Sequence, residues 1–213
     1  MARYAAIDCG TNSLRLLISE DNHGRPREIV RLMEIVRLGQ GVDATGEFAP
    51  EALERTRKVL TKYVDLMQQE RVQDVRMVAT SATRDARNKD EFFAMTAELL
   101  GQIRPGARAQ VITGEEEAKL SFIGAVAYLS KEQGPFCVID LGGGSTEFVV
   151  GVAGGQLLGS YSSQMGCVRI SERIMQSDPP TPEEVEVARQ HVAERLAEVQ
   201  EIVPIASAKT FVG

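Results

Sequence analysis

The sequence is poor in the residues that build disulfides, zinc sites and histidine-based catalytic centres. Its 213 residues include no tryptophan, three cysteines and two histidines. His23 stands in a polar turn and His191 in a charged helical stretch, so neither zinc binding nor histidine catalysis is expected. The cysteines, Cys9, Cys137 and Cys167, lack metal-ligand spacing. Their odd number, with two in strand-like runs, predicts reduced thiols rather than a disulfide framework.

Long apolar runs and an excess of positive charge are also missing. No apolar stretch approaches the roughly 20 residues that cross a bilayer, and Asp8 interrupts the apolar run at the amino terminus, MARYAAIDCG. We therefore expect a cytoplasmic protein without a membrane segment. The net charge of −6 argues against a broad nucleic-acid surface. A polyanionic substrate would need a local cradle of N–H groups, arginines and metal.

Two glycine-rich strand–turn–strand segments share one layout, and in both of them an aspartate ends the first strand. They are AAIDCGTNSLRLLI (residues 5–18), with Asp8, and VIDLGGGSTEFVVG (residues 138–151), with Asp140. Glycine lets backbone N–H groups approach a phosphate closely. A carboxylate about 4 Å from that phosphate would cost about 4 kcal/mol at an effective dielectric of about 20, and a hard divalent cation removes this cost. One such turn is usually only a turn, but two in register favour a phosphate and metal site.

The order of the expected elements repeats along the chain. Strands or hairpin segments are expected at 3–20, 27–38 and 44–48, with a turn at His23-Gly24, and further strands at 75–80 and 109–113. Helices are expected from Pro50, from an Asn88 N-cap to about Gly101, and over 114–130. The second copy is expected as strands at 136–151, 156–165 and 209–213, with helices at 166–176 and from a capping box at Thr181 and Glu184. We expect domains at 1–130 and 131–213, the second of them cut off.

Three charged residues are candidates for chemistry. In TGEEEA (113–118), Thr113 and Glu116 fit a capping box. Glu117 lies one residue past this box, and the sequence leaves open whether its side chain faces solvent or a functional site. Arg84 follows a short strand in a turn rich in hydroxyl residues, where Arg87 is an equal alternative. Alternation places Arg15 on the sheet face opposite Leu14 and Leu16, either in solvent or facing a cleft.

The motifs IDCGTNS, TSATR, TGEEEA, IDLGGGSTE and MGCVRISER, in this order, resemble those of the exopolyphosphatase / guanosine pentaphosphate phosphatase (Ppx/GppA) family. The resemblance covers essentially the whole chain. It implies an α/β fold of the ribonuclease-H-like type, within the actin/Hsp70/sugar-kinase superfold, with two tandem domains flanking a cleft and the second incomplete. It also implies a homodimer for the full-length form.

The family's functional residues can be placed on this sequence by position. The resemblance implies that Glu117 is the catalytic base and that Arg84 stabilises charge on the transferred group. It implies Mg²⁺, with Mn²⁺ as a possible substitute, held by Asp8, Asp140 and Glu147. The implied phosphate contacts come from the two turns and one arginine: Gly10, Thr11, Asn12, Ser13, Arg15, Gly142, Gly143, Gly144, Ser145 and Thr146.

The activity that the resemblance implies is hydrolysis of a terminal phosphoanhydride in inorganic polyphosphate or guanosine pentaphosphate. Two alternatives stay open. One is an ATP-binding kinase or ATPase of the same superfold, which shares the glycine turns but has no counterpart of TGEEEA. The other is a non-catalytic regulator that binds polyphosphate or guanosine polyphosphates without turnover.

Overall fold

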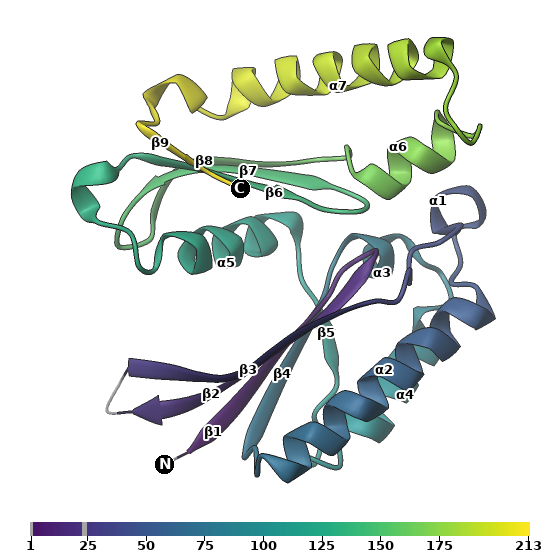
Figure 1. The fold of residues 1–213 in the computed structure, drawn as a ribbon, viewed down its shortest axis with the longest axis vertical. Helices are drawn as coiled ribbons and strands as arrows, with labels where there is room; N and C mark the ends of the chain where they lie inside the picture. Colours follow the sequence, from purple (N-terminus) through teal and green to yellow (C-terminus); the bar gives the residue numbers. More distant parts are fainter. Residues whose placement is uncertain (1, 23–24) are drawn as a thin grey trace. The chain divides into compact units, whose positions relative to one another are not determined.

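The computed structural model describes residues 2–22 and 25–213 and divides the chain into two compact units, residues 1–111 and 112–213 (Figure 1). The sequence placed the boundary after residue 130 instead. Residues 112–130 fall in the second unit because Ala118, Phe122 and Val126 pack in one core with Phe136 and Val138 of the second sheet. The predicted turn at His23-Gly24 lies outside the described residues.

The first unit contains a mixed five-stranded sheet in the order β3-β2-β1-β4-β5, in which β1 pairs antiparallel with β2 and parallel with β4. Its strands are β1 (Arg3–Cys9), β2 (Ser13–Asn22), β3 (Arg25–Ile35), β4 (Asp74–Ala79) and β5 (Ala109–Val111). Its helices are α1 (Val42–Thr45), α2 (Pro50–Gln69), α3 (Ser81–Asp85) and α4 (Lys89–Leu100). Helices α2 and α4 cover one face of the sheet (Figure 1).

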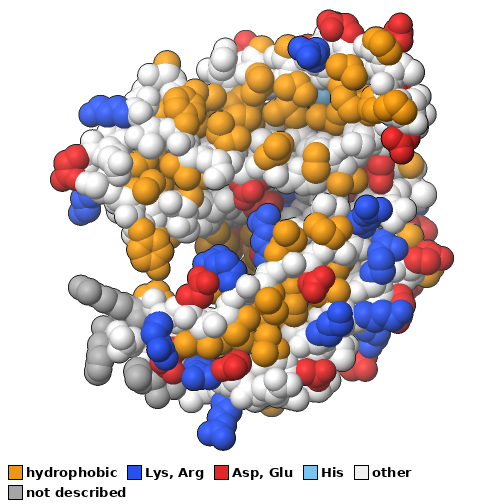
Figure 2. All heavy atoms as spheres, viewed as in Figure 1, with side chains coloured by type: hydrophobic (Ala, Val, Ile, Leu, Met, Phe, Trp, Pro, Cys, Tyr) orange, Lys and Arg blue, Asp and Glu red, His pale blue; other side chains and the backbone are white. Residues whose placement is uncertain are grey.

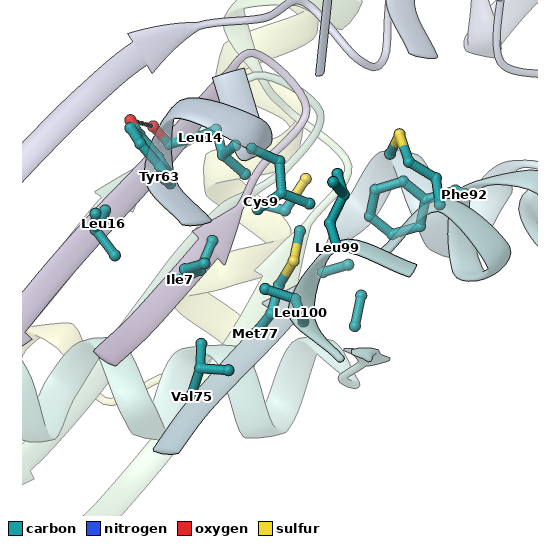
Figure 3. Close-up of a cluster of buried hydrophobic side chains, with 14 of the residues drawn as sticks. Ile7, Cys9, Leu14, Leu16, Tyr63, Val75, Met77, Phe92, Leu99 and Leu100 are labelled. Atoms are coloured by element: carbon teal, nitrogen blue, oxygen red, sulfur yellow. Dashed lines mark hydrogen bonds between the residues drawn. The ribbon is translucent and has the colours of Figure 1, made fainter. Parts of the chain in front are cut away.

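Buried and exposed side chains alternate along β2, and the buried ones form part of the core of the first unit. Leu14, Leu16 and Ile18 are fully buried under α2, whereas Arg15 between them is exposed. Each such buried aliphatic side chain contributes roughly 1.5–3 kcal/mol. The Tyr63 hydroxyl donates a hydrogen bond to the Leu14 carbonyl (2.9 Å), as Figure 3 shows. Burial, with a smaller effect of Glu34, raises the pKa of Tyr63 to about 12, so its proton stays available for this bond.

The second unit repeats this topology with helices on both faces. Its sheet has the order β8-β7-β6-β9, and β6 pairs antiparallel with β7 and parallel with β9, as β1 does with β2 and β4. Its strands are β6 (Phe136–Leu141), β7 (Thr146–Val152), β8 (Gln156–Ser163) and β9 (Thr210–Val212). Its helices are α5 (Gly114–Val126), α6 (Cys167–Arg173) and α7 (Pro182–Ile202), with 3₁₀ turns η1 (Lys131–Gln133) and η2 (Ile205–Ser207). Helices α5 and α7 lie on opposite faces (Figure 1).

Two tandem units of this strand order are the α/β, ribonuclease-H-like architecture of the actin/Hsp70/sugar-kinase superfold, as the sequence predicted. In the first sheet β5 lies next to β4. Within residues 112–213, no strand lies at the equivalent place next to β9. Among the described residues, no helix combines the length and the apolar character needed to cross a membrane. On the face drawn in Figure 2, acidic and basic side chains are interspersed rather than gathered by sign.

Three local predictions need correction. The strand expected at 44–48 is instead the end of the short helix α1 and a turn, with Gly41 and Gly46 in left-handed conformations on either side. The turn expected after β4 begins with helix α3. Asn88 does precede α4, but its side chain makes no capping bond; it pairs with the backbone of Phe48, whose N–H donates to Oδ1 at 2.8 Å. The Asn88 side chain therefore bonds to Phe48, 40 residues earlier in the chain, instead of to the first turn of α4.

The capping prediction at the start of α7 is confirmed. The Thr181 hydroxyl accepts a bond from the Glu184 N–H (3.2 Å), and the Glu184 carboxylate accepts one from the Thr181 N–H (2.8 Å). That N–H bond, and further bonds from Ser177 and Gln176, lower the pKa of Glu184. At α5, Thr113 accepts the predicted bond from the Glu116 N–H (3.1 Å).

Candidate active site

The two glycine turns have the same backbone hydrogen bonding. In the first hairpin Asp8 pairs with Arg15, and in the second Asp140 pairs with Glu147. Each turn is closed by a bond of 3.0 Å, from the Gly10 N–H to the Ser13 carbonyl and from the Gly142 N–H to the Ser145 carbonyl. The second hairpin therefore matches the first residue by residue, as the sequence layout predicted.

The carbonyl groups of the first turn are bonded to the segment that follows β3. The Asn12 carbonyl accepts bonds from the N–H groups of Val36 and Arg37 (both 2.9 Å), and the Thr11 carbonyl accepts one from Gly39 (2.8 Å). Among the described residues, no group accepts a hydrogen bond from the backbone N–H of Thr11 or of Asn12. Adjacent unpaired N–H groups of this kind form an anion-binding concavity.

The carbonyl groups of the second turn are bonded to the start of α6. The Gly142 carbonyl accepts from Cys167 (3.0 Å), and the Gly143 carbonyl accepts from Val168 (2.9 Å) and Arg169 (3.1 Å). These donors are the first N–H groups of a helix, which have no partner inside it. Within the part of the chain that the structure describes, the N–H groups of Gly143 and Gly144 donate to no other group.

The hydroxyl groups beside the second turn are less available than the sequence suggested. Ser145 and Thr146 are both buried. The Thr146 hydroxyl donates to the Met165 carbonyl, which fixes the turn to the segment before α6. Ser13, at the end of the first turn, is half-buried.

The two carboxylates of the second hairpin share one face of its sheet, the face on which α5 packs. The Ser121 hydroxyl of α5 donates to Asp140 (2.5 Å), so this face of α5 is directed at β6. Glu117 precedes Ser121 by four residues and therefore shares that face. Glu117 is half-buried, whereas Glu115 and Glu116 are exposed. Glu117 is thus less exposed than its two neighbours, and its role in a site stays a prediction.

Glu147 is the most buried of these carboxylates, with 1% of its surface exposed. Its Oε1 accepts a bond from the Ser162 hydroxyl (2.7 Å). Ser162 also lies against the start of α5, because a Cβ placed on Gly114 would be 2.8 Å from the Ser162 Cβ. The beginning of α5 therefore lies beside Glu147, and Ser121 lies beside Asp140.

The charged groups of the first unit lie at the carboxyl end of β1 and β4. Arg15 Nη1 is 3.5 Å from Asp8 Oδ2, and both side chains are well exposed. Arg84 lies in α3, which starts directly after β4, and the Thr80 N–H before it donates to the Cys9 carbonyl (3.2 Å). Arg84 is half-buried at the sheet end that carries the first turn.

The structure separates Arg84 from Arg87, which the sequence could not. The Arg87 guanidinium donates to the Thr45 carbonyl (2.9 Å) and to the Glu47 carboxylate (3.2 Å), and it is exposed. Arg87 therefore holds the end of α1. Arg84 remains the candidate for a substrate contact.

The carboxylate pair of the second hairpin has the chemistry of a hard-cation site. Like charges directly opposite each other on adjacent strands are destabilising, which a cation would relieve. Mg²⁺ commonly takes one or two carboxylates and completes its shell with waters and substrate phosphates. Among the described residues no cluster of three or more potential metal ligands exists, so Asp140 and Glu147 would supply the protein oxygens there. Asp8 already has Arg15 as a counter-charge.

Sequence reasoning missed the residues that support the turns. They are Ser121 and Ser162, which bond the carboxylates, and the N–H groups of Val36, Arg37, Gly39 and Cys167–Arg169, which bond the carbonyls. Only Ser121 left a signal, its spacing of four residues from Glu117.

Comparison with known proteins identifies the group to which the chain belongs. Residues 17–213 match the model of the Ppx/GppA phosphatase family. The chain is 55% identical to exopolyphosphatase 2 of Mycobacterium tuberculosis over 217 aligned residues, which span 100% of the chain and 67% of that protein.

Solved structures agree with this match. A crystal structure of an exopolyphosphatase-like protein has a TM-score of 0.88 at 39% identity, covering 99% of this chain and 64% of the other. An Aquifex aeolicus Ppx/GppA family member has a TM-score of 0.71 at 35% identity, covering 93% and 62%. The chain thus spans less than two thirds of the length of these solved structures. It is a member of the Ppx/GppA phosphatase family.

Proposed function

We propose that this protein hydrolyses the terminal phosphoanhydride bond of inorganic polyphosphate and releases orthophosphate. The observation that carries the proposal is the pair of matching turns. In each turn, carbonyl groups accept hydrogen bonds from a neighbouring segment, two backbone N–H groups have no acceptor among the described residues, and an aspartate lies just before the turn. The names of the relatives in Mycobacterium tuberculosis and among the solved structures support the same chemistry.

Each turn binds one phosphate group in this proposal. The N–H groups of Thr11 and Asn12 and those of Gly143 and Gly144 donate to phosphate oxygens, and Arg15 adds a charge contact. Mg²⁺, or Mn²⁺ in its place, would be held in the second unit by Asp140 and Glu147, directly or through water, and would neutralise the repulsion between carboxylate and phosphate. Asp8 is the candidate metal ligand beside the turn of the first unit.

Glu117 acts as the base. It takes a proton from a water molecule whose oxygen attacks the terminal phosphorus, the bond from that phosphorus to the bridging oxygen breaks, and orthophosphate leaves. Its place in the first turn of α5 favours the ionised form that a base needs. Arg84 stabilises the charge that develops on the transferred group.

Guanosine pentaphosphate is a further substrate within this proposal because its terminal anhydride offers the same reacting bond. A homodimer and a cytoplasmic location are part of the same proposal and rest on the family resemblance. The two alternatives from the sequence, an ATPase or kinase and a non-catalytic binder, predict different assay results.

A phosphate-release assay tests the proposal with polyphosphate of defined length, guanosine pentaphosphate and ATP, with and without Mg²⁺. Glu117→Gln should lower the rate by about 10²–10⁴-fold, as expected for a positioned base. Glu115→Gln is the matched control, because it removes the same charge from an exposed position in the same helical turn, and it should keep the rate. Release from ATP alone, or binding without turnover, would overturn the proposal.

A further inference from the structure

Each carboxylate of the second hairpin accepts a hydrogen bond from one serine hydroxyl. Ser121 Oγ, in α5, donates to Asp140 Oδ2 at 2.5 Å, and Ser162 Oγ, in β8, donates to Glu147 Oε1 at 2.7 Å. Both serines are half-buried. A hydroxyl donor limits the rotation of a carboxylate but brings no positive charge to it, unlike an arginine or a lysine. The two bonds therefore orient the carboxylates and do not neutralise them.

The two carboxylates are close enough to share one cation. Asp140 and Glu147 lie directly opposite each other in the register of β6 and β7. Side chains at such positions have Cβ atoms about 4.5–5.5 Å apart. A carboxylate has two oxygens, and a serine hydroxyl has one proton to donate. A serine bond to one oxygen is therefore compatible with coordination of a cation through the other.

Ser162 is itself held against the start of α5. A Cβ placed on Gly114 would lie 2.8 Å from the Ser162 Cβ and 3.0 Å from the Ser162 Oγ. Gly114 is the first helical residue of α5, a conformation that alanine adopts without strain. A methyl group at position 114 would therefore act by displacing Ser162, and not by straining the backbone.

Both serine bonds thus involve α5, the helix that also carries the proposed base. Gly114, Glu117 and Ser121 are three and four positions apart, so they share one face of the helix. Ser121 bonds one carboxylate directly, and the contact of Gly114 with Ser162 reaches the other. The part of α5 on either side of Glu117 is therefore tied to the carboxylate pair.

We propose that Ser121 and Ser162 are positioning residues, which hold Asp140 and Glu147 in the orientation that binds a divalent cation. The inference rests on the proposed function, because it concerns the cation proposed there. The serines act through the carboxylates and do not touch the cation. Removal of a hydrogen-bond partner from a metal-ligating side chain typically costs about 10–100-fold in metal affinity or activity.

Titration with Mn²⁺ tests this inference without an activity assay, because the electron paramagnetic resonance signal of the free ion falls as the ion binds. Ser121→Ala and Ser162→Ala should each raise the Kd for Mn²⁺ by about 10–100-fold. Gly114→Ala should raise it as well, although it removes no polar group, because the added Cβ displaces Ser162. Ser121→Thr keeps the hydroxyl and should retain the affinity of the unaltered protein.

Ser207→Ala is the matched control. Its hydroxyl donates to the Pro204 carbonyl (2.7 Å) at an exposed position of the same unit, so its loss should leave the Kd unchanged. A lower melting temperature of Ser121→Ala and Ser162→Ala at an unchanged Kd would reduce both serines to a structural role and overturn this inference alone. Absence of Mn²⁺ binding by the unaltered protein would overturn the proposed cation, and this inference with it.

Discussion

Arg15 and Glu147 occupy the same register position in two matching hairpins, Arg15 opposite Asp8 and Glu147 opposite Asp140. The first pair is an ion pair at 3.5 Å. The second pair sets two carboxylates side by side, with Glu147 almost fully buried. At this register position the first hairpin therefore carries an ion pair, and the second carries two carboxylates.

Glu147→Gln should abolish stabilisation of the protein by Mg²⁺. For the unaltered protein, a Mg²⁺ concentration about 100 times the Kd would add about 2.7 kcal/mol to the free energy of unfolding. The variant loses half of the carboxylate pair, so its melting temperature should hardly respond. Thermal unfolding with and without Mg²⁺ measures this, and Glu183→Gln in the exposed first turn of α7 is the control. An equal Mg²⁺ response in both variants would contradict the assignment.

Arg84→Ala and Arg87→Ala should have different effects, although the residues are three positions apart. Loss of a donor to the transferred group lowers kcat by about 10²–10³-fold, so Arg84→Ala should lower phosphate release by that order. Arg87 holds Thr45 and Glu47 at an exposed position, and such pairs contribute about 0–1 kcal/mol. Arg87→Ala should therefore retain activity. Rates and melting temperatures of both variants, measured together, check this, and a large rate loss in Arg87→Ala would reverse the two roles.

Gly39→Ala should displace the first turn. A Cβ at this buried position would lie 2.3 Å from Thr11 Cγ2 and 3.1 Å from the Ala82 Cβ. Overpacking of this kind costs about 1–3 kcal/mol, and here it also pushes on a residue whose N–H faces the proposed phosphate. Urea unfolding and phosphate release should both be impaired.

Gly124→Ala is the comparison for that variant. A Cβ at Gly124 meets nothing within 4 Å in α5, so the same change should stabilise the helix by roughly 0.5–1 kcal/mol. Equal stability of the two variants would show that the contact of Gly39 with Thr11 is not restrictive.

Glu20 should make the stability of the first unit sensitive to acid. Hydrogen bonding to Arg27 (2.7 Å), together with Arg3, lowers the pKa of this buried carboxyl below its ordinary 4.5. The folded state then binds the proton less tightly than the unfolded state, so the contribution is present above about pH 4.5 and is lost as pH falls through the folded pKa. Urea midpoints should separate Glu20→Gln from the unaltered protein at neutral pH. That gap should narrow as the pH falls below the ordinary glutamate pKa, and a gap that stays constant would refute the mechanism.

The sequence predicted most of the elements because their signals are local. Both hairpins follow from apolar runs broken by glycine, and the start of α7 follows from the capping box of Thr181 and Glu184. The helix at 114–126 was also expected, but not the sheet on which it packs. Periodicity identifies an apolar face and cannot identify its partner.

The residues that support the candidate site could not be predicted from the sequence. Helical spacing separates Glu117 from Glu115 and Glu116 only once Ser121 is known to bond Asp140. Arg84 and Arg87 differ only through the contacts of Arg87 with α1, more than 40 residues earlier. Both distinctions depend on long-range contacts, which single-sequence patterns do not contain.

The hydrogen bonds behind the two glycine turns prevent their peptide planes from rotating. The Thr11 carbonyl, in the same peptide plane as the Asn12 N–H, accepts a bond from Gly39, and the Gly143 carbonyl, in the same plane as the Gly144 N–H, accepts bonds from Val168 and Arg169. A flip of either peptide would break these bonds. The N–H dipoles beside them keep one direction whether or not an anion is present, and little reorganisation energy is spent when one arrives. The polarity of each turn is therefore set during folding, by residues 36–39 and by the first residues of α6.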